Sequence, residues 1–99
     1  MARVIKNHYL GGELEEEYFE NNGKKEGEYK RYYENGQLWE ICEYVGGKIE
    51  GEYKLYHPNG QLWEICNYVN GKIEGEYNNY YSDGQHRSTS NYVDDIPIS

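Results

Sequence analysis

The chain has 99 residues, enough for one small domain, and a formal net charge of −8. This charge disfavours binding to nucleic acid or to anionic lipid, since both attract clustered Lys and Arg. Leu, Ile, Val and Phe make up only 17 of the 99 residues, but 13 tyrosines and two tryptophans recur at fixed spacing. We therefore expect a folded chain with a thin aromatic core. No stretch is apolar enough for a transmembrane helix, and residues 1–10 lack the apolar core of a signal peptide.

The chain divides into tandem copies of one 24-residue unit, within a single predicted domain over residues 1–99. A degenerate first copy occupies approximately residues 3–26. The second and third copies, residues 27–50 and 51–74, differ at five of 24 positions. The last copy, residues 75–99, begins in register as GEYNNYYSDGQ and then diverges, so we expect it to act as a degenerate cap.

Glycine punctuates the array in alternating steps of 11 and 13 residues, at positions 12, 23, 36, 47, 60, 71 and 84. The runs between the glycines are rich in Tyr, Ile, Val and Trp and predict strands, and none shows a helical apolar stripe. Asn70-Gly71 predicts a two-residue type I′ turn, and Pro58-Asn59-Gly60 predicts a three-residue loop. The pattern predicts an all-β fold, with tandem antiparallel β-hairpin repeats in an elongated, twisted single sheet or solenoid.

Loops of two and three residues leave an odd number of strand residues in each 24-residue repeat, so one residue must be absorbed in a bulge. We expect the bulge at Gly51 and its equivalents, because an isolated strand glycine often marks one. A bulge there sets Leu55 opposite Trp63 and Tyr53 opposite Ile65 on a shared inner face. One repeat earlier the equivalent pairs are Arg31 with Trp39 and Tyr29 with Ile41.

The residues G-x-Y-x-x-Y-Y-x-N-G-Q-L, followed by Y-x-N-G-K-x-x-G, resemble the MORN repeat (membrane occupation and recognition nexus). The best match is the variant with slightly longer repeats, often described as antitoxin-like in bacteria. The resemblance covers residues 9–93 and is strong over residues 27–85. It implies an elongated sheet of successive hairpins, no catalytic residues, and a role in binding or scaffolding.

Cys42 and Cys66 occupy the same position in adjacent repeats with one strand between them. Their Cα atoms should lie about 9–10 Å apart, too far for a disulfide bond. We expect two free, half-buried thiols and a reducing, cytoplasmic setting. The chain has no close group of metal ligands, no recognisable nucleophile motif and no phosphate-binding loop, so we expect no metal, no cofactor and no enzymatic activity.

The last copy replaces apolar residues with polar ones, and two interpretations stay open. Where the third copy has Leu62 and Trp63, the last has His86 and Arg87. The substitutions are typical of a polar cap that keeps a repeat array soluble. Alternatively, His86 and Arg87 form a specialised contact site.

A single sheet of hairpins can cover a face only by coiling, by dimerising or by meeting a partner. We therefore expect a non-catalytic protein-binding or scaffold module that contacts a protein partner or self-associates. The candidate contact residues are Tyr29, Trp39, Ile41, Tyr53, Leu55, Trp63, Ile65 and Tyr77. The main alternative, implied by the resemblance, is an antitoxin-like inhibitor of a basic toxin. Carbohydrate binding by exposed rings and membrane-surface association are weaker alternatives, and the negative charge disfavours the latter.

Overall fold

The computed structural model describes residues 2–98, which form one 11-stranded antiparallel sheet without any helix. None of these residues forms a helix able to cross a membrane. The strands are β1 (Arg3–His8), β2 (Leu14–Asn21), β3 (Lys24–Tyr32), β4 (Leu38–Val45), β5 (Lys48–Ile49), β6 (Gly51–Tyr56), β7 (Leu62–Val69), β8 (Lys72–Ile73), β9 (Gly75–Tyr80), β10 (His86–Val93) and β11 (Ile96–Pro97).

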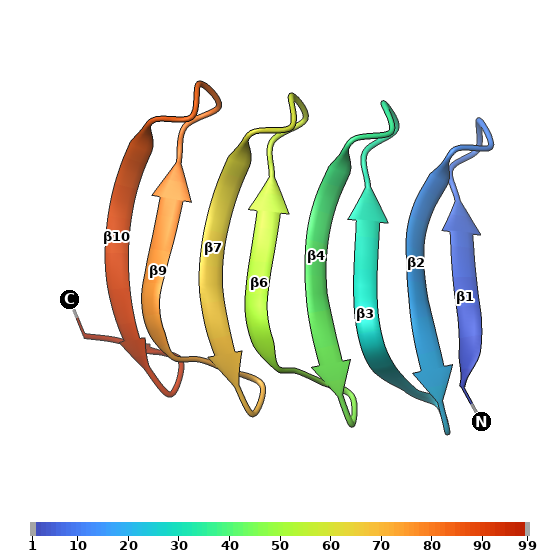
Figure 1. Ribbon diagram of the computed structural model, residues 1–99, viewed down its shortest axis with the longest axis horizontal. Helices are drawn as coiled ribbons and strands as arrows, with labels where there is room; N and C mark the ends of the chain where they lie inside the picture. Colours follow the sequence, from blue (N-terminus) through green and yellow to red (C-terminus); the bar gives the residue numbers. More distant parts are fainter. Residues whose placement is uncertain (1, 99) are drawn as a thin grey trace.

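The longer strands lie side by side in chain order, and each of them pairs with the next longer strand along the sequence (Figure 1). The short strands β5 and β8 pair with β4 and β7 at the ends of the longer hairpins. The sheet measures 40 × 32 × 14 Å, so it is a single layer with no second layer over either face. The predicted all-β fold of tandem hairpins is confirmed.

Both predicted turn types are present, because glycine and asparagine occupy the positions that need a positive φ. Asn70 and Gly71 have φ values of 57° and 84°, as a type I′ turn requires. In the other loop the N–H of Gly60 donates to the carbonyl of His57 at 2.9 Å. The N–H of His57 in turn donates to the carbonyl of Gln61 at 2.8 Å, which closes the three-residue loop.

The bulge that changes the faces lies at tryptophan and not at glycine. In the β6–β7 ladder Tyr56 pairs with Leu62, but Leu55 pairs with Glu64, so Trp63 is the extra residue. The ring of Trp63 stacks on the ring of His57 with centroids 4.8 Å apart. This stacking stabilises the bulge that takes Trp63 out of the regular ladder. The predicted position at Gly51 was wrong, because it considered only the conformational freedom of glycine and not this contact between side chains.

Gly51 marks a different irregularity. Between the pairs Ile41–Lys54 and Tyr44–Ile49, β4 advances by three residues while the facing chain advances by five. The surplus is even, so it leaves every side chain on its original face. Gly51 has a φ of 88° there, and a methyl group in place of its hydrogen would meet no atom within 4 Å.

The position of the bulge overturns the predicted pairing. Tyr53 lies opposite Cys66 and not Ile65, while Ile65 lies opposite Lys54. One repeat earlier, Tyr29 likewise lies opposite Cys42 and not Ile41. We call the face with Tyr29, Cys42, Tyr53, Cys66 and Tyr77 the tyrosine face, and the face with Lys30, Ile41, Lys54 and Ile65 the isoleucine face.

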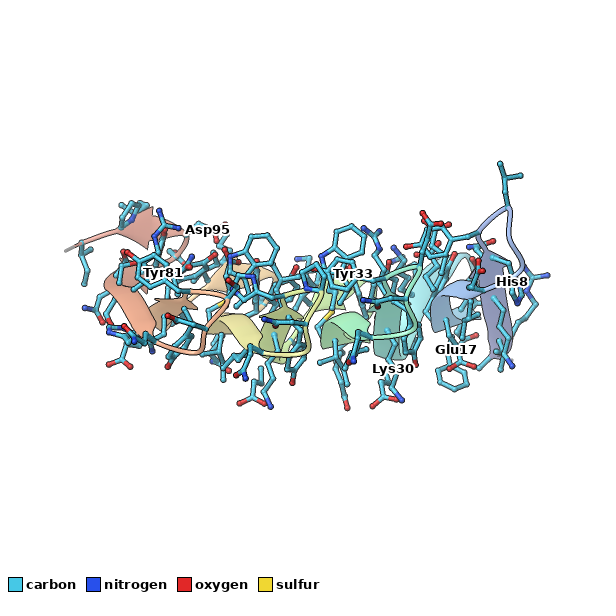
Figure 2. The ribbon with its side chains drawn as sticks, turned by 90° about the horizontal axis from the view of Figure 1, so that it is seen from above. His8, Glu17, Lys30, Tyr33, Tyr81 and Asp95 are labelled. Carbon is cyan, nitrogen blue, oxygen red and sulfur yellow. The ribbon has the colours of Figure 1, made fainter. Side chains whose placement is uncertain are left out.

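The tyrosine face holds the most buried side chains, since Tyr29, Cys42 and Cys66 are only 3–4% exposed. Figure 2 shows the layer edge-on, with Tyr33 on one side of it and Lys30 and Glu17 on the other. The thin core predicted from composition therefore occupies one side of the layer.

The backbone at Gly51 gives a direct test of this geometry. Replacing Gly51 with Ala should lower the free energy of unfolding by about 1–2 kcal/mol, because an L-residue at this positive φ is strained even where space is open. Denaturant unfolding followed by tryptophan fluorescence measures the change. The control Asn67→Ala, at an exposed strand position, should stay within about 0.5 kcal/mol of wild type. Equal stability of the two variants would contradict the prediction.

Candidate functional site

Hydrogen bonds between neighbouring repeats recur every 24 residues at three levels of the sheet. At the middle level, a tyrosine hydroxyl on the tyrosine face meets a glutamate carboxylate on the preceding strand. Tyr29 donates to Glu16 at 2.5 Å, and Tyr53 donates to Glu40. The equivalent hydroxyl of Tyr77 is hydrogen-bonded to Glu64. These bonds link one hairpin to the next through half-buried polar groups.

The environment of these tyrosines keeps their hydroxyls protonated. Burial, with the carboxylate of Glu40 second, raises the pKa of Tyr53 well above its ordinary value. Burial opposes ionisation of Glu16 as well, but hydrogen bonds from Tyr29 and Asn7 lower its pKa overall. In the first pair, Tyr29 is therefore a neutral donor and Glu16 a charged acceptor, which is a strong form of hydrogen bond.

At the upper level, a ring near each three-residue loop bonds to a backbone carbonyl of the next repeat. Tyr33 donates to the carbonyl of Tyr56 at 2.6 Å. One repeat later His57 replaces the tyrosine, and its Nε2 lies 2.8 Å from the carbonyl of Tyr80, so this nitrogen carries the proton. The role of His57 is thus structural, as a ring in a strand.

At the lower level, a carboxylate accepts the N–H of a turn in the next repeat. The carboxylate–turn pairs are Glu26 with Gly46 at 2.9 Å, Glu50 with Asn70 at 2.8 Å and Glu74 with Asp94 at 2.7 Å. The acidic residues that recur in every copy therefore cap turns, and this accounts for part of the high glutamate content.

The structure does not bring the eight predicted contact residues together. Ile41 and Ile65 lie on the isoleucine face, whereas the tyrosine face carries Tyr29, Trp39, Tyr53, Leu55, Trp63 and Tyr77. Tyr29 is only 3% exposed, so its side chain is not free for a partner. For the remaining residues a contact role stays a prediction.

The isoleucine face carries an acidic hollow that sequence reasoning missed. Glu28 and Glu43 lie directly opposite each other on β3 and β4. With Glu50, Glu52 and Lys54 they line a hollow of about 370 Å³. Lys30 pairs with Glu28 and Lys54 with Glu52, each at 3.2 Å, so acidic groups outnumber basic ones there. The sequence contained one signal for this site. The two central copies differ at only five positions, and at one of them Glu43 of the second copy is replaced by Asn67 in the third.

The last repeat lacks most of the groups that would bond to a further copy. Asp83 replaces the amide donor of Asn59, Ser88 replaces the carboxylate of Glu64, and Ile98 replaces that of Glu74. The ladders therefore end chemically at β10 and β11, which favours the cap interpretation. His86 and Arg87 are exposed, with the Arg87 guanidinium 5.7 Å from the centroid of the Tyr81 ring.

The two cysteines are free, as predicted, but they are buried and not half-buried. Burial, with a nearby glutamate second, raises the pKa of Cys66 to about 11 and that of Cys42 to about 12. A thiol with such a pKa is a poor nucleophile at neutral pH. Within residues 2–98, no group of His, Cys, Asp and Glu is arranged to hold a metal ion.

The hydrogen bonds of the upper level, from a ring to a carbonyl of the next repeat, can be tested at equivalent positions of two repeats. Tyr33→Phe should lower the free energy of unfolding by about 0.5–1.5 kcal/mol, because it removes the hydroxyl that binds the carbonyl of Tyr56. Tyr81→Phe is the matched control, since no residue among those described accepts a hydrogen bond from the Tyr81 hydroxyl. Urea denaturation of both variants measures the difference. A loss at Tyr81 as large as that at Tyr33 would argue against the ladder.

The raised thiol pKa values predict alkaline destabilisation. The unfolded chain loses its thiol protons near the ordinary pKa of 9.0, while the folded chain keeps them to about pH 11–12. Stability should therefore be fully present below pH 9 and should fall as the pH rises through that window. Urea midpoints across this range measure the trend. The Cys42→Ala/Cys66→Ala variant should show a shallower decline, and an unchanged slope would exclude a thiol contribution.

Comparison with known proteins agrees with the architecture. The family model of the MORN repeat variant matches residues 25–45, 49–70 and 73–94, which together cover more than half of the chain. The three matches begin 24 residues apart, the period found in the sequence. No curated protein and no solved structure matches the chain. The chain belongs to the MORN repeat variant family, whose repeats commonly serve as binding modules.

Proposed function

We propose that this chain is a non-catalytic module that binds a protein with a basic surface through the acidic hollow of the isoleucine face. The observation that carries the proposal is the pairing of Glu28 directly opposite Glu43. Like charges opposite each other on neighbouring strands destabilise a sheet. Lys30 pairs with Glu28 at 3.2 Å, but among residues 2–98 no cation pairs with Glu43, so the repulsion is only partly offset. A local conflict of this kind is typical of a functional site, where binding is favoured over stability.

The surroundings of the hollow suit a protein partner. Val45 and Val69 lie on the same face and are 57% and 50% exposed, so apolar surface flanks the carboxylates. Protein interfaces combine apolar contacts with charged groups at their margins. The net charge of −8 would also steer a basic partner toward the chain and speed association. The two free thiols fit a reducing compartment, and we expect the complex to form in the cytoplasm.

An antitoxin-like inhibitor would be one form of this function. The acidic hollow would favour inhibition of a toxin that has a basic surface. Co-expression with a candidate toxin distinguishes this form from a scaffold, because only an inhibitor restores growth.

Self-association is a separate prediction, and the edges of the sheet limit its form. Head-to-tail stacking would need the C-terminal edge to supply the bonds of a preceding repeat. Asp83, Ser88 and Ile98 cannot supply them. Head-to-tail stacking through these side chains is therefore disfavoured, and light scattering on the purified chain measures any self-association.

A charge-matched pair of variants tests the proposed partner site. Glu28→Gln/Glu43→Gln should lose salt-sensitive capture of basic proteins from a native extract. Its stability should stay within about 1 kcal/mol of wild type, because relief of the repulsion is offset by loss of the exposed Glu28–Lys30 ion pair. Glu13→Gln/Glu34→Gln removes the same charge from exposed loop positions and should keep binding. Quantitative mass spectrometry of the captured proteins reads the result, and equal capture by both variants would overturn the proposal.

A further inference from the structure

The chain contains four Asn-Gly sequences, at Asn22, Asn35, Asn59 and Asn70. This dipeptide can modify itself without an enzyme. The backbone nitrogen of the glycine attacks the side-chain amide carbon of the asparagine, a C–N bond forms, and ammonia leaves. Water then opens the five-membered ring to give aspartate or isoaspartate. The reaction consumes one water, releases one ammonia and involves no oxidation or reduction.

The structure restrains this reaction at Asn35 and Asn59. The side-chain nitrogen of Asn35 donates to the carbonyl of Pro58 at 2.9 Å, and its oxygen accepts the N–H of Gln37 at 2.9 Å. The attacking nitrogen, that of Gly36, donates to the carbonyl of Tyr33 at 3.0 Å. The same three bonds recur at Asn59, where the side chain binds Ser82 and Gln61.

Asn70 is restrained at the backbone only. Its N–H donates to the carboxylate of Glu50 at 2.8 Å, and the N–H of Gly71 donates to the carbonyl of Ile49 at 3.1 Å. No residue among those described bonds to its exposed side-chain amide. The preceding repeat therefore holds this turn in place but leaves the reacting amide free.

Asn22 lacks the carboxylate cap that Asn70 has, because Ala2 stands 20 residues before it, where Glu50 stands before Asn70. Within residues 2–98, no group bonds to the side-chain amide of Asn22. Asn22 is exposed, and no atom lies within 4 Å of the position that a Gly23 side chain would occupy. Asn22 also has a φ of 53°, a conformation that residues other than glycine adopt at a cost.

We propose that Asn22 is a site of spontaneous deamidation, and that the stack of repeats protects the equivalent positions downstream. Asn70 reacts more slowly than Asn22, and Asn35 and Asn59 react most slowly. Conversion adds a negative charge to the β2–β3 turn. The isoaspartate product also adds one atom to the main chain, which is incompatible with the two-residue type I′ turn.

The test is prolonged incubation of the full chain in mildly alkaline buffer, followed by peptide mapping. Tandem mass spectrometry locates each converted asparagine, and enzymatic methylation of isoaspartate quantifies that product. In the folded protein Asn22 should convert at least roughly tenfold faster than Asn35 or Asn59, because two side-chain hydrogen bonds must break at the latter. In denaturant the four rates should converge.

Two variants complete the design. Asn22→Gly removes the site and should fold normally, because this chain already uses Gly46-Gly47 in an equivalent turn. It should abolish the early product and leave the rates at the other sites unchanged. Asn70→Gly should leave the early product intact. Conversion of Asn35 or Asn59 as fast as Asn22 in the folded protein would overturn the proposal, as would a ranking that persists in denaturant.

Discussion

A bond between a side chain of one repeat and a fixed polar group of the next is the interaction on which this sheet depends. A lone hairpin is at best marginally stable in water, so each hairpin must draw stability from its neighbour. The Tyr53–Glu40 bond, the Tyr33 bond to the Tyr56 carbonyl and the Glu50 cap on the Asn70 turn do this at three levels between the second and third repeats. The sequence repeats every 24 residues because each hairpin must present the same bonding groups to the next.

The same bonds explain how a chain with few aliphatic residues folds. Tyrosine brings a large ring for burial and a hydroxyl that must then find an acceptor. Rings from adjacent strands meet on the tyrosine face, as Tyr53 meets Tyr68 with centroids 5.5 Å apart. The carboxylates satisfy the hydroxyls, so the core consists of aromatic rings and polar bonds together.

This arrangement gives the two faces different surroundings. The tyrosine face is occupied by contacts within the chain, which leaves less of it for a partner. The isoleucine face makes fewer internal contacts and carries the opposed Glu28 and Glu43 with exposed valines nearby. The ends of the array differ as well. The last repeat lacks most of the linking groups, and Ala2 stands where a glutamate would cap the turn at Asn22.

The sequence by itself determined the hairpin period, both turn types and the free thiols, because Gly, Asn and strand spacing act over a few residues. Only the tertiary structure decided which residues share a face. The stack of Trp63 on His57 places the bulge, and this moves Ile41 and Ile65 away from the tyrosines with which they were grouped. Likewise, Tyr53 meets Glu40 across 13 positions of the chain. Such contacts depend on strand register, and one displaced residue reverses the faces of all that follow.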